Sequence, residues 1–218
     1  MPESFHVTDR TRLLREANRA VYDRDAIYRI LDEALICHVG FSGADNQPFV
    51  IPTMFARVGD HLYFHGSAAS RMLRGLSSRL PVCITVTLAD GLVLARSVFN
   101  HSMNYRSVVA FGRAQLIDDP VEKLAALQAF TERLIPGRWN DARQPNEKEL
   151  KATSILKLPL TEVSAKVRTG DVEDDADDYP LPVWAGVIPL RLVADPPLRD
   201  SRCDSTIPAP AYAAHYRR

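Results

Sequence analysis

The chain has 218 residues, of which 46% are hydrophobic and 25% are charged, and this composition excludes a disordered or fibrous protein. The 27 Lys and Arg residues balance 27 Asp and Glu residues, so nothing favours a nucleic-acid-binding surface. No apolar run reaches membrane-spanning length, and the N-terminus lacks the apolar core of a signal peptide. These features predict a soluble, cytoplasmic protein without a membrane partner.

Two helices are predicted before the first strand. Thr8 or Asp9 precedes Leu13 and Leu14 in a pattern that favours a short capped helix. From Arg24 to Leu35, apolar residues recur at helical spacing and predict an amphipathic helix.

Three strands follow, over residues 34–41, 48–58 and 61–66. The turn sequence SGADNQ at 42–47 joins the first two strands into a hairpin. Pro52 is unusual in a strand because it has no N–H to donate to a neighbouring strand. It therefore marks a sheet edge, a bulge or a break that faces a ligand.

The segment from Gly59 to Leu76, GDHLYFHGSAASRMLRGL, has the features of a phosphate site. Small residues lead from the third strand into a helical pattern that begins at Ser70 and Arg71. A helix that starts in this way leaves backbone N–H groups free to bind an anion. Ser70 adds a hydroxyl and Arg71 a planar cation. An ordinary capped surface helix with a solvated arginine is an equally good interpretation of this segment alone.

Further elements are predicted between residues 81 and 166. In chain order they are strands over 81–88, 92–95 and 104–117, a helix from Asp118 to Leu134, a short helix over 146–151 and a strand pair over 154–166. An Asp90-Gly91 turn separates the first two of these strands. Because hairpins rather than βαβ units join the early strands, the pattern predicts a mainly β (α+β) fold, an antiparallel barrel with helices packed outside it.

The composition changes after Gly170, which divides the chain into a domain over 1–170 and an extension over 171–218. The acidic run DVEDDADD at 171–178 is interpreted as a solvated linker rather than a metal site, because adjacent like charges repel each other into solvent. The apolar stretch over 180–192 is expected to dock on the barrel or on a partner subunit.

The three cysteines, Cys37, Cys83 and Cys203, lie far apart in the chain. An odd and sparse set argues against a disulfide framework and fits a reducing compartment. No CxxC or paired Cys and His spacing indicates zinc, so the sequence predicts no metal-binding residues.

Three pieces of the chain together resemble the pyridoxamine 5′-phosphate oxidase-like, FMN-binding split-barrel superfamily. They are VIPTMFARVGDHLYFHGSAASRMLRGL, HSMNYRSVVAFGRAQLI and PVWAGVIPL, in the expected order. Within the superfamily, the chain resembles the flavin-nucleotide-binding branch that includes the nitroimidazole reductases. The resemblance implies an antiparallel split β-barrel with FMN at the interface of a homodimer.

The resemblance also implies which residues hold the flavin. The strand from Val50 to Met54 is expected along the polar edge of the isoalloxazine ring. Phe64 and His65 are expected to approach the ring or the ribityl chain, while Ser70 and Arg71 hold the phosphate. The expected cofactor-binding residues are Val50, Ile51, Pro52, Thr53, Met54, Phe64, His65, Gly66, Ser70, Arg71, Tyr105, Arg106, Ser107 and Trp184.

Two parts of this set have further implications. The second subunit is expected to line the flavin with Tyr105, Arg106 and Ser107. The pocket is expected to be closed by Trp184 together with Arg191.

The implied function is that of an FMN-dependent oxidoreductase that passes electrons between a nicotinamide donor and a small-molecule acceptor, with His65 as the candidate catalytic residue. A hydrogen-bonded loop histidine is an equally good interpretation of His65, whereas His38 and His101 are interpreted as structural. The alternative is a storage or sensor protein that binds flavin, haem or a deazaflavin without robust catalysis. Met72 stands where the oxidase has a lysine, so one phosphate charge is missing or supplied from elsewhere. Pyridoxamine 5′-phosphate oxidation is disfavoured, because the oxidase sequence around Trp184 and Arg191 is not reproduced and the substrate-binding residues of the oxidase are not evident.

Overall fold

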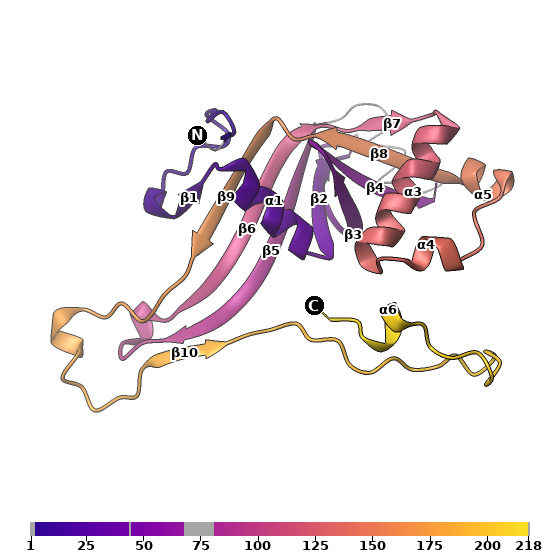
Figure 1. Cartoon of the computed structure of the whole chain (residues 1–218). Helices are drawn as coiled ribbons and strands as arrows, with labels where there is room; N and C mark the ends of the chain where they lie inside the picture. The colour runs from indigo at the N-terminus through magenta and orange to yellow at the C-terminus, as the bar shows by residue number, and fades with distance from the viewer. Residues whose placement is uncertain (1–2, 44, 68–80, 218) are drawn as a thin grey trace.

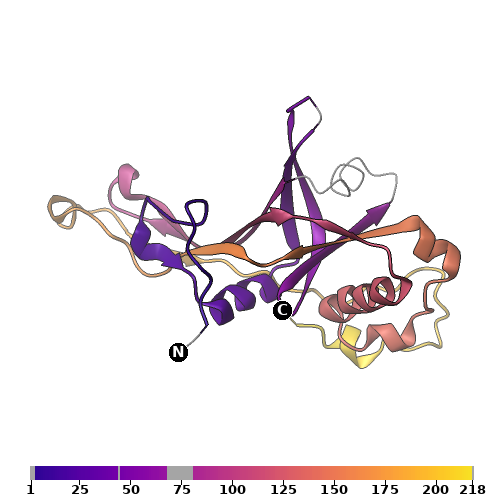
Figure 2. The ribbon, with the colours of Figure 1, turned by 90° about the horizontal axis from the view of Figure 1, so that it is seen from above.

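A computed structural model describes residues 3–43, 45–67 and 81–217 of the chain, and Figures 1 and 2 show it from two directions. Within these residues, ten strands form one antiparallel sheet, which confirms the predicted mainly β fold. The strands are β1 (Ala20–Val21), β2 (Ile36–Ser42), β3 (Pro48–Val58), β4 (His61–Ser67), β5 (Pro81–Leu94), β6 (Ser102–Arg113), β7 (Gln115–Ile117), β8 (Thr153–Pro159), β9 (Glu162–Arg168) and β10 (Gly186–Pro189).

Helices flank this sheet. They are α1 (Arg24–Glu33), α3 (Pro120–Leu134), α4 (Arg138–Asp141), α5 (Glu147–Ala152) and α6 (Ala211–Ala214), with 3-10 turns η1 (Ala17–Arg19), η2 (Val98–Asn100) and η3 (Ala176–Asp178). Helices α3, α4 and α5 gather at one end of the sheet, and the long β5–β6 ribbon extends from the other end (Figure 1). None of the described helices has the length and hydropathy of a transmembrane span.

Local signals account for the helices that were predicted correctly. Asp119 begins α3 because its carboxylate accepts hydrogen bonds from the N–H groups of Val121 and Glu122. Asn146 begins α5 through a capping box with Glu149. The prediction of α1 is confirmed as well, with Asp23 accepting a hydrogen bond at its start.

The sheet follows the order β1-β9-β6-β5-β2-β3-β4-β8-β7, and β10 adds to β5. Strand β3 links the two halves of the barrel, because residues 48–54 pair with β2 whereas residues 55–58 pair with β4. Pro52 lies in the half of β3 whose one described neighbour is β2, so its missing N–H interrupts no second ladder. Of the three interpretations of Pro52, the structure therefore supports a sheet edge.

The interior of the barrel is a continuous apolar core. Ile27 and Leu31 of α1 pack there against inward side chains of the sheet, such as Phe64, Ile84 and Leu158. Full burial of one such side chain contributes about 1.5–3 kcal/mol. A second, smaller cluster lies beneath α3, so α1 and α3 cover different surfaces of the same sheet.

Two predictions of local structure are wrong, one near Leu13 and one within β5. No helix forms near Leu13, because the hydroxyl of Thr11 accepts a hydrogen bond from the N–H of Thr8 at 2.8 Å and closes a turn instead. Asp90 and Gly91 do not form a turn either. They lie inside the continuous strand β5, where the pairing with β6 shifts register between Ala89 and Gly91.

The strand predicted over 104–117 is divided at Ala114, which is fully buried. Strand β6 before this point pairs with β5 and β9, and β7 after it pairs with β8. Gly112 lies just before this change. A Cβ atom at Gly112 would be 2.7 Å from Cδ1 of Leu158, so close packing with β8 requires glycine there.

The acidic run is not simply a solvated linker. The carboxylate of Asp174 has no exposed surface and accepts a hydrogen bond from the guanidinium of Arg96 at 2.9 Å. This contact also lowers the pKa of Asp174, against the opposing effect of burial. The predicted solvated linker is therefore corrected to a segment that is anchored beside the end of β5.

Beyond this anchor, the C-terminal extension is held at two points. Strand β10 pairs with β5, and the hydroxyl of Tyr212 in α6 donates to Asp141 of α4 at 2.7 Å. Between them the chain runs alongside the body as an extended segment (Figure 1).

Candidate functional site

The residues predicted to bind the flavin fall on two faces of the sheet. Residues that pair across an antiparallel sheet share a face. Val50, Pro52 and Met54 of β3 pair with Gly40, His38 and Ile36 of β2, and His38 in turn pairs with Thr85 of β5. Thr87 and Ala89 of the same β5 face pair with Ser107 and Tyr105 of β6. The register therefore brings Val50, Pro52, Met54, Tyr105 and Ser107 together on the outward face of the barrel.

This outward face is apolar and open. The exposed fractions are 65% for Val50, 51% for Ile36 and 43% for Met54. Isolated exposed apolar residues are ordinary, but several on adjacent strands mark a surface that binds something. His38 also lies on this open face, so it is an exposed residue of the barrel and not a core residue.

Other predicted residues lie on the inward face. Ile51 and Thr53 pair with Val39 and Cys37, which are fully buried in the core. Phe64 is also fully buried. Its side chain has no surface to offer a ligand, so only its backbone is left for the predicted approach to the flavin.

Arg106 has partners within its own chain. Its guanidinium donates two hydrogen bonds to Asp90, at 2.8 and 2.7 Å, and contacts Glu33 at the end of α1. The hydrogen bonds to Asp90 and Glu33 raise the pKa of Arg106. The structure thus shows Arg106 joining α1 to β5 and β6, and the prediction that it lines the flavin remains a prediction.

Trp184 and Gly66 are placed apart from the outward face of β3. Trp184 precedes β10 and covers Gly186, where a Cβ atom would be 2.9 Å from the indole ring. Gly66 pairs with Ser154 of β8. Ser70 and Arg71 lie outside the described residues.

His65 has the most unusual surroundings among the predicted residues. It follows Phe64 on β4 and therefore points to the same outward side as Met54, and its ring lies 4.4 Å from the ring of Phe130 of α3. Its Nδ1 atom is buried and has no hydrogen-bond partner in the described part of the chain. Burial lowers the pKa of His65 below its usual 6.5, so the ring is neutral at pH 7.

Beside His65 is a hollow of ≈ 380 Å³ between β3, β4, α3, α4 and α5. Apolar and aromatic side chains form most of its walls, and a charged pair stands among its lining residues. The residues that line it are Met54, His65, Leu127, Phe130, Thr131, Leu134, Trp139, Arg143, Pro145 and Glu149. Because Met54 belongs both to this hollow and to the outward face of the sheet, the two form one continuous candidate site.

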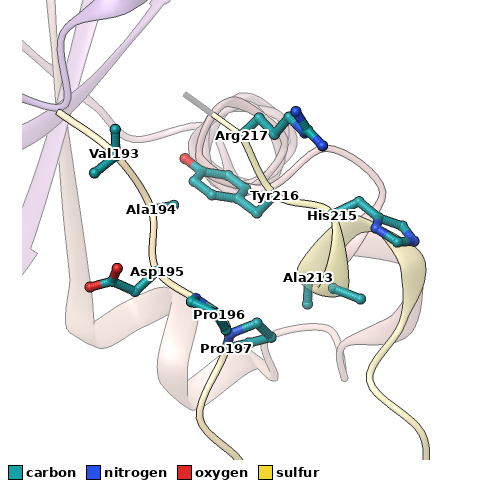
Figure 3. A pocket seen from close by; sticks show the side chains of 10 residues that line it. Val193, Ala194, Asp195, Pro196, Pro197, Ala213, His215, Tyr216 and Arg217 are labelled. Carbon is teal, nitrogen blue, oxygen red and sulfur yellow. The ribbon is translucent and has the colours of Figure 1, made fainter. Parts of the chain in front are cut away.

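A larger hollow of ≈ 420 Å³ lies in the C-terminal extension, between Val193–Pro197 and Ala213–Arg217 (Figure 3). None of the predicted site residues lines it. We therefore place the candidate site at His65, where a buried unpaired nitrogen, apolar walls and the outward sheet face meet.

Sequence reasoning missed the α-helical half of this hollow. The sequence predicted a helix that includes Phe130, but neither Phe130 nor Trp139 carried a signal that connected it to His65. The available sequence signal was helical spacing of apolar residues, which indicates that this face of α3 packs against other residues. These apolar residues are Leu127, Phe130 and Leu134.

The chemistry of the site fits a flat, largely apolar cofactor. Exposed aliphatic side chains on β3 suit the face of an aromatic ring system, and the open edge of β3 leaves backbone groups free for its polar rim. No cluster of three His, Cys, Asp or Glu side chains suited to a metal ion occurs among the described residues.

Comparisons with known proteins support this assignment. The family profile described as pyridoxamine 5′-phosphate oxidase matches residues 23–167. The structure of the flavocytochrome Anf3 from Azotobacter vinelandii has 44% sequence identity and a TM-score of 0.90, over 94% of this chain and 95% of that chain. No curated protein sequence matches the chain.

Two further solved structures are similar. The FAD and haem binding protein from Mycobacterium smegmatis has 35% identity and a TM-score of 0.85, covering 89% of this chain and 95% of that one. A protein assigned to 5-nitroimidazole antibiotic resistance in Bacteroides thetaiotaomicron has 26% identity and a TM-score of 0.58, covering 68% of this chain and 86% of that one. The chain therefore belongs to the pyridoxamine 5′-phosphate oxidase family of flavin-binding split barrels.

Proposed function

We propose that this protein is a redox protein that binds a flavin nucleotide and a haem and works as a homodimer. The observation that carries the proposal is the extent of the likeness to the flavocytochrome and to the FAD and haem binding protein. The first covers 94% of a chain of 218 residues, so at most about 13 residues lie outside it. The likeness must therefore include most of the extension over 171–218.

In this proposal the outward face of the sheet holds the flavin. Val50 and Met54 offer apolar contact to the ring, and the open edge of β3 around Pro52 offers backbone groups to its polar rim. Ser70 and Arg71 bind the phosphate. A bound flavin supplies hydride and single-electron transfer, while the protein supplies binding, orientation and electrostatics.

The homodimer follows from the openness of the same face. The exposed aliphatic residues of β2 and β3 in one subunit need a cover, and a second copy placed about a twofold axis would bury the same surface on both subunits. Tyr105 and Ser107 share this face, so they are in position to complete the flavin site of the partner.

The reaction we propose passes electrons from a nicotinamide donor through the flavin to a small acceptor. The competing proposal is a sensor or storage protein that binds the same flavin and haem without robust catalysis. Anaerobic addition of NADH or NADPH separates the two, because only the proposed enzyme bleaches its flavin absorbance at a catalytic rate.

The first test is the cofactor content of the purified full-length protein. We expect a flavin spectrum together with a Soret band, and release of FMN or FAD that mass spectrometry identifies. The Mycobacterium smegmatis protein favours FAD over the predicted FMN. A colourless protein that takes up neither group from solution would overturn the proposal.

The second test concerns the phosphate. Arg71→Ala is expected to weaken flavin binding by roughly 10- to 100-fold, since a hydrogen bond to a charged group contributes about 1.5–3 kcal/mol. The matched control is Arg202→Ala, because the Arg202 side chain is 90% exposed in the C-terminal extension. Equal flavin affinity in both variants would remove Arg71 from the site.

A further inference from the structure

A haem needs an apolar cavity for its ring and a side chain that can bind its iron. The chain has six histidines, and their surroundings differ. His6, His38, His101 and His215 are exposed, and the Nδ1 atom of His101 already lies 2.8 Å from the carbonyl oxygen of Ser97. His61 and His65 are half-buried, and of these two His65 lines the hollow beside α3.

Neither ring nitrogen of His65 has a hydrogen-bond partner among the described residues, and Nδ1 is buried in that state. A neutral imidazole carries one proton and one lone pair. Leaving the buried Nδ1 unengaged is unfavourable, and Nε2 is not among the buried unpaired atoms, so a group bound in the hollow can reach Nε2.

The walls of the hollow suit a porphyrin. Phe130 packs against the imidazole, and Trp139, Leu127 and Leu134 extend the apolar surface along α3 and α4. The volume of ≈ 380 Å³ lies within the range of cofactor sites. These walls would also keep water away from the ring edge.

The charged pair in the lining suits the acidic groups of a haem. Arg143 donates hydrogen bonds to Glu149 at 2.7 and 3.0 Å. The hydrogen bond from Arg143 lowers the pKa of Glu149 to about 2. Because the pair is exposed at the surface, Arg143 can exchange Glu149 for a propionate, which is also a carboxylate.

We propose that the hollow between β4, α3 and α4 is the haem site and that His65 supplies an axial ligand to its iron. The inference rests on the proposed function, which supplies the haem. It separates the two cofactors, with the flavin on the outward face of β3 and the haem beside it, and Met54 between them.

The test compares histidine variants of the full-length protein produced with ample haem. Haem per subunit is measured as the pyridine haemochrome, flavin per subunit after release, and folding by circular dichroism and thermal unfolding. In His65→Ala we expect haem content to fall by roughly tenfold or more, since even indirect disturbance of a metal ligand costs about 10- to 100-fold in affinity. Flavin content is expected to stay unchanged.

The matched controls are His6→Ala, at an exposed position near the N-terminus, and His101→Ala, at the far end of the β5–β6 ribbon. Both are expected to keep their haem. Adding imidazole to His65→Ala is expected to restore haem binding and the Soret position. His65→Cys is expected to bind haem with a shifted Soret band, because a thiolate replaces an imidazole.

The outcomes separate the inference from the proposed function. Haem retained in His65→Ala with an unchanged Soret band overturns the role of His65 while leaving a flavin- and haem-binding protein. Loss of haem in His6→Ala or His101→Ala alone has the same consequence. A wild-type protein that carries flavin but takes up no haem overturns both the inference and the haem part of the proposed function.

Discussion

Phe64 and His65 are consecutive residues of β4, yet their side chains serve opposite faces of the sheet. Phe64 is fully buried in the barrel core, whereas His65 points to the outward side and lines a hollow with an unpaired buried nitrogen. The same contrast separates Phe55, which is buried, from Met54, which is 43% exposed. Because side chains alternate along a strand, one short segment both builds the scaffold and presents the site.

This comparison shows that the two faces of the split barrel have different roles. The inward face is satisfied by apolar packing within one chain and needs nothing else. The outward face leaves apolar side chains, an open strand edge and a histidine without partners, so it depends on a ligand or a second subunit. Substitutions on the inward face should therefore change stability, and those on the outward face should change cofactor binding.

The largest expected effect tests the inward face. Phe64→Ala is expected to lower the free energy of unfolding by about 3–5 kcal/mol, because it removes a fully buried aromatic side chain and leaves a cavity. Met54→Ala is the outward control and is expected to cost about 1 kcal/mol or less. Chemical denaturation measures both values, and equal losses in the two variants would contradict the division between the faces.

Arg106 provides a second test of the two faces. The sequence predicted that it lines the flavin, whereas in the structure it pairs with Asp90 and Glu33. If Arg106 acts through these contacts, Arg106→Ala lowers the free energy of unfolding by about 1–3 kcal/mol, the scale of hydrogen bonds between charged groups. Flavin affinity then stays as in the wild type. Fluorescence titration with flavin checks this, and a loss of flavin binding at unchanged stability would return Arg106 to the flavin site.

The smallest expected effect concerns the pH dependence of the cofactor-free protein. The pKa of His65 is lowered by burial in the folded state and lies near 6.5 when the chain is unfolded. The unfolded chain therefore binds more protons as the pH falls through 6.5, and folding loses stability in that direction. Above pH 6.5 the folded protein keeps its full stability, because the His65 ring is neutral in both states.

His65→Gln removes this titration. We expect the wild type to lose stability relative to His65→Gln as the pH falls from above 6.5 toward the lowered pKa of the folded state. Thermal unfolding of both proteins across this range provides the measurement. Parallel stability curves would show that His65 is as solvated in the folded chain as in the unfolded one.

Much of the fold was predictable because its signals are local. The hairpin of β2 and β3 follows from two apolar strands around a polar turn, and α3 follows from Asp119, Pro120 and the spacing of its apolar residues. The wrong predictions arose where contacts distant in sequence compete with local signals. Asp90-Gly91 has the composition of a turn, but pairing with β6 on one side and β10 on the other keeps β5 continuous through it.

The candidate site was predictable only in part. The resemblance identified the outward residues of β3 and His65, but it assigned Phe64 and Arg106 to the flavin without information on which face each side chain occupies. Nor did the sequence connect His65 with Trp139, which is 74 positions away, because the hollow that both residues line depends on how α3 and α4 pack against β4.

The sequence by itself determined the class of the fold, the family and the strands that carry the site, since apolar periodicity and turn residues act over a few positions. The tertiary structure alone decided which neighbours face inward, which arginines are already paired, and where a histidine is left without a partner. The reason is physical: burial and hydrogen-bond partners are properties of packing between distant segments, and no local pattern encodes them.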